Sequence, residues 1–157
     1  MKMTTFLLFL MLMAAAVQAT DLPLLEGELP RAEILAQLPP YQERFDASTP
    51  DEAALKDFPA LPPGLEVYAV FGSWCDDSLE QVPKLMKLLD RLRVPETSVH
   101  WIAVNRSKQD PDGLTAGMGI ERVPTFLFFQ SGREIGRIVE SPKLSMEKDL
   151  ARILAAR

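Results

Sequence analysis

The chain has 157 residues, of which 47% are hydrophobic and 25% are charged, and its formal net charge is −5. This length supports one hydrophobic core, so we expect one globular domain. No basic cluster stands out, which argues against a nucleic-acid partner. With one cysteine, Cys75, and one histidine, His100, the chain has no internal disulfide and falls short of a recognisable zinc or iron–sulfur ligand set.

Residues 1–19 have the order of a secretory signal peptide. Lys2 precedes the apolar run Phe6–Val17, and the segment ends in the small residue Ala19, followed by Thr20. The alternative is a membrane anchor, but the run is short for a membrane span and no later stretch approaches that length. We therefore predict a cleaved signal peptide, a mature chain that starts at Thr20, and a periplasmic or secreted protein without membrane contact after cleavage.

Residues 20–48 are rich in proline, and we predict that they form a short helical N-terminal extension. The stretch Pro30–Gln37 has an apolar side typical of a short helix. Thr49-Pro50-Asp51-Glu52 has the residues of an N-cap, a first-turn proline and an acidic first turn. We expect both helices to pack on the domain that follows, residues 49–157, as structural elements.

The next segments alternate between strand and helix patterns. Leu65–Gly72 is an apolar, β-prone run that predicts a buried strand. Apolar residues then recur at helical spacing from Leu79 to Leu92, which predicts an amphipathic helix beginning near Cys75. Val99–Val104 predicts a second strand, parallel to the first because a helix connects them.

The last third of the sequence continues this pattern after a loop at residues 105–113. A short helical stretch is expected around Leu114–Met118. Thr125–Phe129 and Glu134–Val139 flank a turn with Ser131-Gly132 and predict a β-hairpin. Leu144–Ala156 predicts a closing helix. The fold class is therefore α/β, with a central mixed β-sheet flanked by helices.

Cys75 lies where the first predicted strand ends and the helix begins. Unpaired backbone N–H groups and the positive end of the helix dipole favour a thiolate there, and thiolate is the nucleophile of disulfide exchange. Asp76 and Asp77 oppose this effect because neighbouring negative charge disfavours a thiolate. Ser78 lies one helical turn further on, where its hydroxyl either donates a hydrogen bond to the thiolate or caps the helix.

These residues resemble the thioredoxin superfamily. Trp74-Cys75-Asp76-Asp77-Ser78 is similar to its Trp-Cys-x-x-Cys motif, with serine in place of the second cysteine. Pro83 is similar to the helix-kinking proline of thioredoxins, and Val123-Pro124-Thr125 resembles the cis-proline segment that precedes a strand. Gly132 fits the following hairpin turn. The resemblance covers residues 49–156 and implies an exported bacterial protein with a thioredoxin-like fold.

The resemblance also implies roles for individual residues. Cys75 and Ser78 would occupy the two catalytic positions of the motif, and a cis Pro124 would lie against the active-site loop. Val123 would offer backbone groups to an extended peptide or thiol substrate, and Trp74 would flank the site. An aromatic side chain that only covers the helix terminus is the alternative for Trp74.

The chain departs from the family in two places. Ala69 stands where thioredoxins carry a buried carboxylate, six residues before the nucleophilic cysteine, and the resolving cysteine is absent. Ordinary dithiol–disulfide cycling is therefore excluded for a monomer. His100 is no substitute base, because it lies near the start of its strand whereas Cys75 follows the end of the parallel neighbour.

Three functions remain open. The first is a monothiol thiol–disulfide oxidoreductase, in which a mixed disulfide on Cys75 is resolved by an external protein or low-molecular-weight thiol. The second is a non-catalytic module that binds peptides or a partner in the groove around Trp74, Val123 and Pro124. The third, a thiol peroxidase, is less favoured because the motif resembles thioredoxin. We expect a monomer without cofactor or metal.

Overall fold

The computed structural model describes residues 17–156. The predicted signal peptide, residues 1–19, lies outside the described residues except for Val17, Gln18 and Ala19. No helix within the described part combines the length and the apolar character that crossing a membrane requires.

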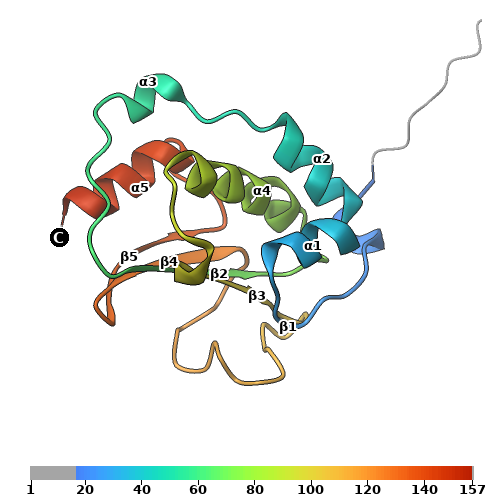
Figure 1. The fold of residues 1–157 in the computed structure, drawn as a ribbon. Helices are drawn as coiled ribbons and strands as arrows, with labels where there is room; N and C mark the ends of the chain where they lie inside the picture. The colour runs from blue at the N-terminus through green and yellow to red at the C-terminus, as the bar shows by residue number, and fades with distance from the viewer. Residues whose placement is uncertain (1–16, 157) are drawn as a thin grey trace, which may run out of the picture.

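Among the described residues, five strands form one mixed sheet (Figure 1). They are β1 (Gly27–Glu28), β2 (Leu65–Phe71), β3 (Val99–Ala103), β4 (Thr125–Gln130) and β5 (Arg133–Val139), and their spatial order is β1-β3-β2-β4-β5. β2 and β3 are parallel, whereas β1 with β3, β2 with β4, and β4 with β5 are antiparallel. The predicted parallel strand pair, the hairpin and the α/β fold class are confirmed.

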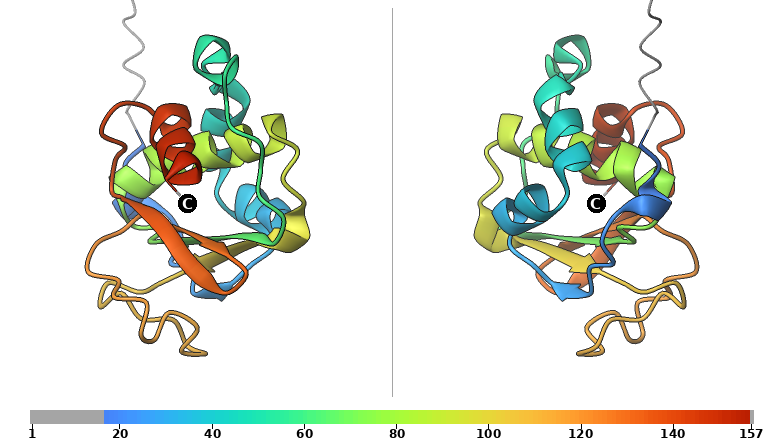
Figure 2. Two further views of the ribbon diagram at one scale, coloured as in Figure 1. Left: turned by 90° about the vertical axis from the view of Figure 1, so that its left-hand side faces the viewer. Right: turned by 90° about the vertical axis from the view of Figure 1, so that its right-hand side faces the viewer.

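The helices lie on one side of this sheet (Figure 2). They are α1 (Arg31–Gln37), α2 (Pro39–Ala47), α3 (Glu52–Leu55), α4 (Asp76–Arg91) and α5 (Met146–Ala155), with short 3₁₀ turns η1 (Ala19–Asp21) and η2 (Glu96–Ser98). The long connection between β3 and β4 loops past the opposite face of the sheet (Figures 1 and 2).

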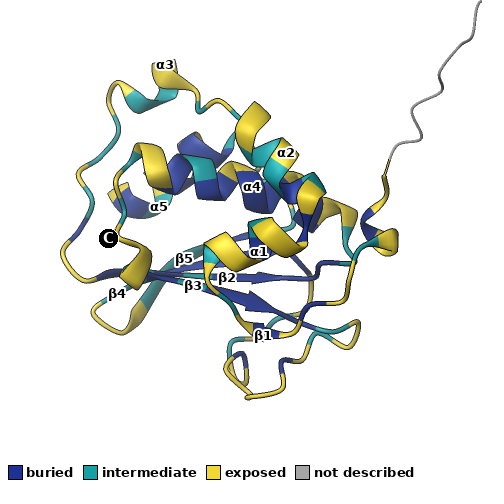
Figure 3. Ribbon diagram, turned by 45° about the vertical axis from the view of Figure 1, so that its right-hand side comes forward, coloured by how far each residue is buried: buried dark blue, intermediate teal, exposed yellow. Residues whose placement is uncertain are grey.

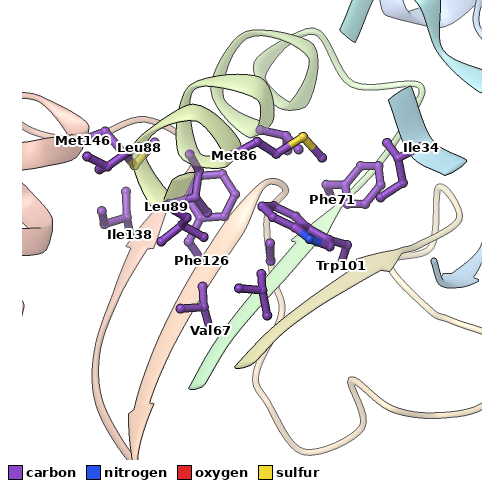
Figure 4. Close-up of a cluster of buried hydrophobic side chains, with 14 of the residues drawn as sticks. Ile34, Val67, Phe71, Met86, Leu88, Leu89, Trp101, Phe126, Ile138 and Met146 are labelled. Carbon is purple, nitrogen blue, oxygen red and sulfur yellow. The ribbon is translucent and has the colours of Figure 1, made fainter. Parts of the chain in front are cut away.

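Side chains alternate between the two faces of β2, as the strand geometry requires. Val67, Ala69 and Phe71 belong to the main core beneath the helices, whereas Val70 belongs to a smaller cluster on the other face. Figure 4 shows the main core between the sheet and α4, and Figure 3 shows that the central strands are buried while the outer helix faces are exposed. Burial of each large apolar side chain stabilises the fold by about 1.5–3 kcal/mol.

The N-terminal extension shares this core. Ile34 of α1, Tyr41 of α2 and Leu38, which joins the two helices, are fully buried in the same cluster as the sheet residues. Burial raises the pKa of the Tyr41 hydroxyl, with a smaller contribution from nearby Cys75, and this hydroxyl has no hydrogen-bond partner among the described residues. The extension is therefore an integral part of the folded unit.

Two local predictions are wrong in detail. Residues 114–118 form turns and a bend and no helix, because Gly113, Gly117 and Gly119 have positive φ and interrupt a helical backbone. The N-cap of α3 is Asp51 rather than Thr49, since the Asp51 carboxylate accepts the amides of Ala53 and Ala54.

Asp110 organises the loop that joins β3 to β4. Its carboxylate accepts the amides of Leu114 at 2.8 Å and Thr115 at 2.9 Å, and the Thr115 hydroxyl at 2.6 Å. Burial alone would raise the pKa of Asp110, but the hydrogen bonds from Thr115 and Leu114 outweigh that effect and lower the pKa to about 2, from an ordinary value of 3.8. The ionised carboxylate is therefore part of the folded loop.

A pH titration of stability should reveal this carboxylate. Because the folded-state pKa lies below the unfolded-state value, Asp110 stabilises the fold fully above the unfolded pKa, and that contribution is lost as the pH falls from 3.8 through about 2. Asp110→Asn is expected to lower the free energy of unfolding near neutral pH by about 1–2 kcal/mol. The difference from wild type should shrink as the pH falls through this window, in urea unfolding at a series of pH values.

Asp112→Asn is the matched control, since Asp112 is exposed in the same loop. A difference between wild type and Asp110→Asn that is independent of pH across the acidic range would show that the carboxylate charge does not stabilise the loop.

Candidate functional site

Cys75 is the N-cap residue of α4, with φ −104° and ψ 124°, at the end of a short turn that follows β2. Its amide donates to the carbonyl of Gly72 at 3.0 Å, which closes this turn. The side chain is half-buried, and Pro83 lies inside the helix that follows. The predicted position of the cysteine, between a strand end and a helix N-terminus, is confirmed.

The thiol of Cys75 faces the segment before β4. It donates to the carbonyl of Val123 at 3.3 Å, and the Val123–Pro124 peptide bond is cis, as predicted. The Thr125 hydroxyl donates to the Arg122 carbonyl at 2.7 Å, and the Pro124 carbonyl accepts the Glu140 amide at 2.7 Å, so both sides of this segment are held. The structure thus brings Cys75, Val123 and Pro124 together.

Ser78 lies one turn into α4 and is fully buried. Its hydroxyl oxygen accepts the Gly72 amide at 3.2 Å and stabilises the turn that carries Cys75. The structure shows neither of the two sequence-based alternatives for this hydroxyl: it contacts the Gly72 amide in the turn before α4, and neither the cysteine sulfur nor an amide of the first helical turn.

Trp74 flanks the cysteine. Its indole N–H donates to the carbonyl of Val104 at 3.0 Å, and it packs with Cys75 against the smaller cluster of Val70, Val104, Val123 and Leu127. The ring lies so close to Gly72 that a Cβ on that residue would be 2.6 Å from the indole. The absence of a side chain at Gly72 therefore makes room for the Trp74 ring.

Comparisons with known proteins agree with this geometry. No protein-family model matches the sequence. A thioredoxin-like protein of Acanthamoeba polyphaga mimivirus is 25% identical over 87 residues, which are 55% of this chain and 61% of that protein. The chain therefore spans about three fifths of the length of this curated relative.

Two solved structures are also similar. A protein of unknown function from Pseudomonas aeruginosa has a TM-score of 0.54 and 14% identity, over 83% of this chain and 91% of that chain. The germline-specific thioredoxin Deadhead of Drosophila melanogaster has a TM-score of 0.41 and 20% identity, over 73% and 89%. The chain has a thioredoxin-like fold. The viral relative also supports the predicted resemblance to the thioredoxin superfamily.

An N-terminal strap, residues 19–25, lies beside the candidate site, which the sequence did not predict. The buried Ser73 hydroxyl donates to the Pro23 carbonyl at 2.7 Å and accepts the Leu25 amide at 3.0 Å. The Ala19 amide donates to the Asp76 carboxylate at 2.8 Å. The strap therefore contacts the residues on both sides of the Trp74-Cys75 pair.

Charged residues of both signs lie near the candidate site. Asp76 and Asp77 are exposed in the first turn of α4, where carboxylates interact favourably with the helix dipole. The guanidinium of Arg106 lies 5.1 Å from the centre of the Trp74 ring. Within residues 17–156 no cluster of three or more histidine, cysteine or acidic side chains is arranged to hold a metal ion.

His100 is not at this site. It pairs with Tyr68 in the sheet register, whereas the end of β2 next to the cysteine turn pairs with Ala103. Its Nδ1 atom lies 2.7 Å from the Glu28 carboxylate, and its ring stacks on Tyr68 with centroids 4.4 Å apart. The sequence-based interpretation of His100 as a structural residue agrees with these contacts.

Proposed function

We propose that this chain is a monothiol thiol–disulfide oxidoreductase whose nucleophile is Cys75. The observation that supports the proposal best is the position of the Cys75 thiol. It is half-exposed, lies at the N-terminus of the sixteen-residue helix α4, and contacts the Val123 carbonyl next to cis-Pro124. Because Cys75 is the only cysteine of the chain, the resolving thiol comes from another molecule.

The proposed reaction has two exchange steps. Cys75 loses its proton to solvent, and the thiolate attacks one sulfur of a substrate disulfide; the substrate S–S bond breaks and the other half leaves as a thiolate. An external thiolate then attacks the substrate sulfur of the mixed disulfide and releases the Cys75 thiolate. The products of the second step are the free Cys75 thiolate and a new disulfide between the external thiol and the substrate half. Each exchange therefore begins and ends with one thiolate and one disulfide.

The groups around Cys75 have separate parts in this scheme. The free amides in the first turn of α4 stabilise the thiolate, both as attacking and as leaving group. The Val123 carbonyl oxygen lies 3.3 Å from the Cys75 sulfur and accepts a hydrogen bond from the thiol. Deprotonation of the thiol removes this hydrogen bond, and the carbonyl is then free to accept a backbone amide of a peptide substrate. Trp74 covers the side of the sulfur that faces the smaller cluster.

Intact-mass measurement with a neutral disulfide tests the proposal. Wild-type protein treated with hydroxyethyl disulfide is expected to gain one mercaptoethanol adduct, and added glutathione should remove it. The Cys75→Ser variant should gain none. An unfolded chain that reacts while the folded protein stays unmodified would show that the thiol is only a buried core side chain.

The alternative function, a binding module that does not turn over, predicts a different outcome. Peptide or partner binding would then persist unchanged in Cys75→Ser, and the wild-type thiol would trap no disulfide substrate. For either function we propose export, with residues 1–19 removed, so that the mature chain lacks the Ala19 amide that donates to Asp76. Intact mass of the protein from a periplasmic fraction, compared with a mature start at Thr20, tests this.

A further inference from the structure

Arg106 follows the end of β3 and lies over the ring of Trp74, with its guanidinium carbon 5.1 Å from the ring centre. The indole is itself held by the hydrogen bond to Val104 and by its contact with Gly72, so the platform under the guanidinium has a fixed position. This cation–π contact uses the charge of the guanidinium and none of its N–H donors.

These N–H groups have no carboxylate partner in the structure. Within residues 17–156 every described ion pair involves other residues, and no acidic side chain lies within ion-pair distance of Arg106. By contrast Arg91, Arg122 and Arg137 are each paired with a glutamate. Arg106 is exposed, so its donors are free to bind a ligand from solvent.

Arg106 contacts the residue next to the nucleophile. Trp74 and Cys75 are adjacent in the chain and pack on the same cluster, and the guanidinium lies over the Trp74 ring. A guanidinium with unpaired N–H groups matches the geometry of a carboxylate, which it binds through two parallel hydrogen bonds.

The nearest acidic residues in the sequence follow Cys75 directly. Asp76 and Asp77 are exposed in the first turn of α4 and form no ion pair with Arg106. In the segment before the cis-proline Glu121 is exposed, and Arg122 is paired with Glu140. Arg106 is therefore available to a carboxylate from a ligand.

We propose that Arg106, which lies over Trp74, is a carboxylate-binding subsite beside Cys75, so that the preferred substrates are thiols and disulfides with a carboxylate close to the reacting sulfur. This rests on the proposed function, since the subsite selects among disulfides that Cys75 attacks. The chemical step is unchanged: the Cys75–substrate S–S bond forms, the substrate S–S bond breaks, and the leaving thiolate takes a proton from solvent.

Three small aliphatic disulfides of different charge test the subsite. Dithiodiglycolate is dianionic, hydroxyethyl disulfide is neutral and cystamine is dicationic, and adduct formation on Cys75 is followed by intact mass for each. The measured quantity is the rate with dithiodiglycolate divided by the rate with hydroxyethyl disulfide. A change in the thiolate fraction affects both rates equally, so the ratio isolates the contact with the carboxylate.

Arg106→Ala is expected to lower this ratio by about three- to fivefold, the size of an exposed ion pair. Arg106→Lys keeps the charge and should retain more than half of the preference, whereas Arg106→Glu should reverse the order of dithiodiglycolate and cystamine. The wild-type ratio should fall as salt is raised, because an exposed pair is screened over about 10 Å at 0.1 M.

Arg133→Ala is the matched control. Arg133 is also exposed and unpaired by a carboxylate, but it begins β5 at the far end of the sheet from Cys75. An equal fall of the ratio in Arg133→Ala, or an unchanged ratio in Arg106→Ala, overturns the subsite while leaving the proposed function intact. Absence of any adduct with all three disulfides in wild type overturns the proposed function and the subsite together.

A pair of peptide disulfides tests whether the bound carboxylate belongs to a protein substrate or to a low-molecular-weight substrate. One carries glutamate and the other glutamine next to the cysteine. A preference for the glutamate peptide that is lost in Arg106→Ala supports the subsite with protein substrates. A preference confined to the small disulfides supports it with low-molecular-weight substrates.

Discussion

The Ser78→Cys variant is expected to reduce insulin disulfides catalytically with a dithiol recycling system, whereas the wild-type protein is expected to be inactive in the same assay. Cys75 is the N-cap of α4 and Ser78 lies three residues on, one helical turn away. A thiol at position 78 can attack the mixed disulfide on Cys75, which a hydroxyl cannot do. The gain should be roughly tenfold or more above the wild-type background.

The surroundings of position 78 and the residue Ala69 affect the stability and the turnover of the Ser78→Cys variant. The new sulfur is a weaker acceptor than the Ser78 hydroxyl for the Gly72 amide, so a stability loss of about 1 kcal/mol should accompany it. Ala69, fully buried in β2, leaves the core without a proton acceptor for the second thiol. Adding Ala69→Asp to Ser78→Cys should raise turnover further, provided that chemical denaturation shows the double variant to be folded.

The control is Ser78→Ala, which removes the hydroxyl without adding a thiol and should stay inactive. If wild type turned over as fast as Ser78→Cys, the monothiol mechanism would be wrong. If Ser78→Cys gained nothing and Cys75 trapped no disulfide, a binding module would be the better interpretation.

The sequence predicted most of the sheet because each central strand is a continuous apolar run, buried on both faces. Leu65–Gly72 and Val99–Val104 match β2 and β3 to within a residue at the end of each strand. β1 has only two residues, Gly27–Glu28, and becomes a strand solely by pairing with Ala103 and Ile102. No local pattern of two residues can predict such pairing, which depends on a segment far along the chain.

The same distinction applies to the candidate site. Cys75, Ser78, Val123 and Pro124 lie in short motifs, so a resemblance could predict them. Ser73 and Arg106 act through contacts with Leu25 and Trp74, residues 48 and 32 positions away in the sequence. A buried serine next to a motif carries no local signal, and neither does an arginine in a loop, because each contact depends on the folded chain.

The buried hydroxyl of Ser73 provides the second prediction with a large expected effect. The hydroxyl donates to the Pro23 carbonyl at 2.7 Å, its oxygen accepts the Leu25 amide at 3.0 Å, and the residue is fully buried. Ser73→Ala leaves both backbone groups of the strap without a partner. We expect a loss of about 2 kcal/mol in the free energy of unfolding, since an unpaired buried polar group costs about 1–3 kcal/mol.

The strap should also open locally in Ser73→Ala. Hydrogen exchange at the Leu25 amide is expected to accelerate strongly, while amides of the central strands respond only to the global loss of stability. Ser107→Ala, at an exposed serine in the β3–β4 loop, is the control and should change none of these quantities. Unchanged exchange at Leu25 together with unchanged stability in Ser73→Ala would show that the strap is held by its apolar contacts and not by this hydroxyl.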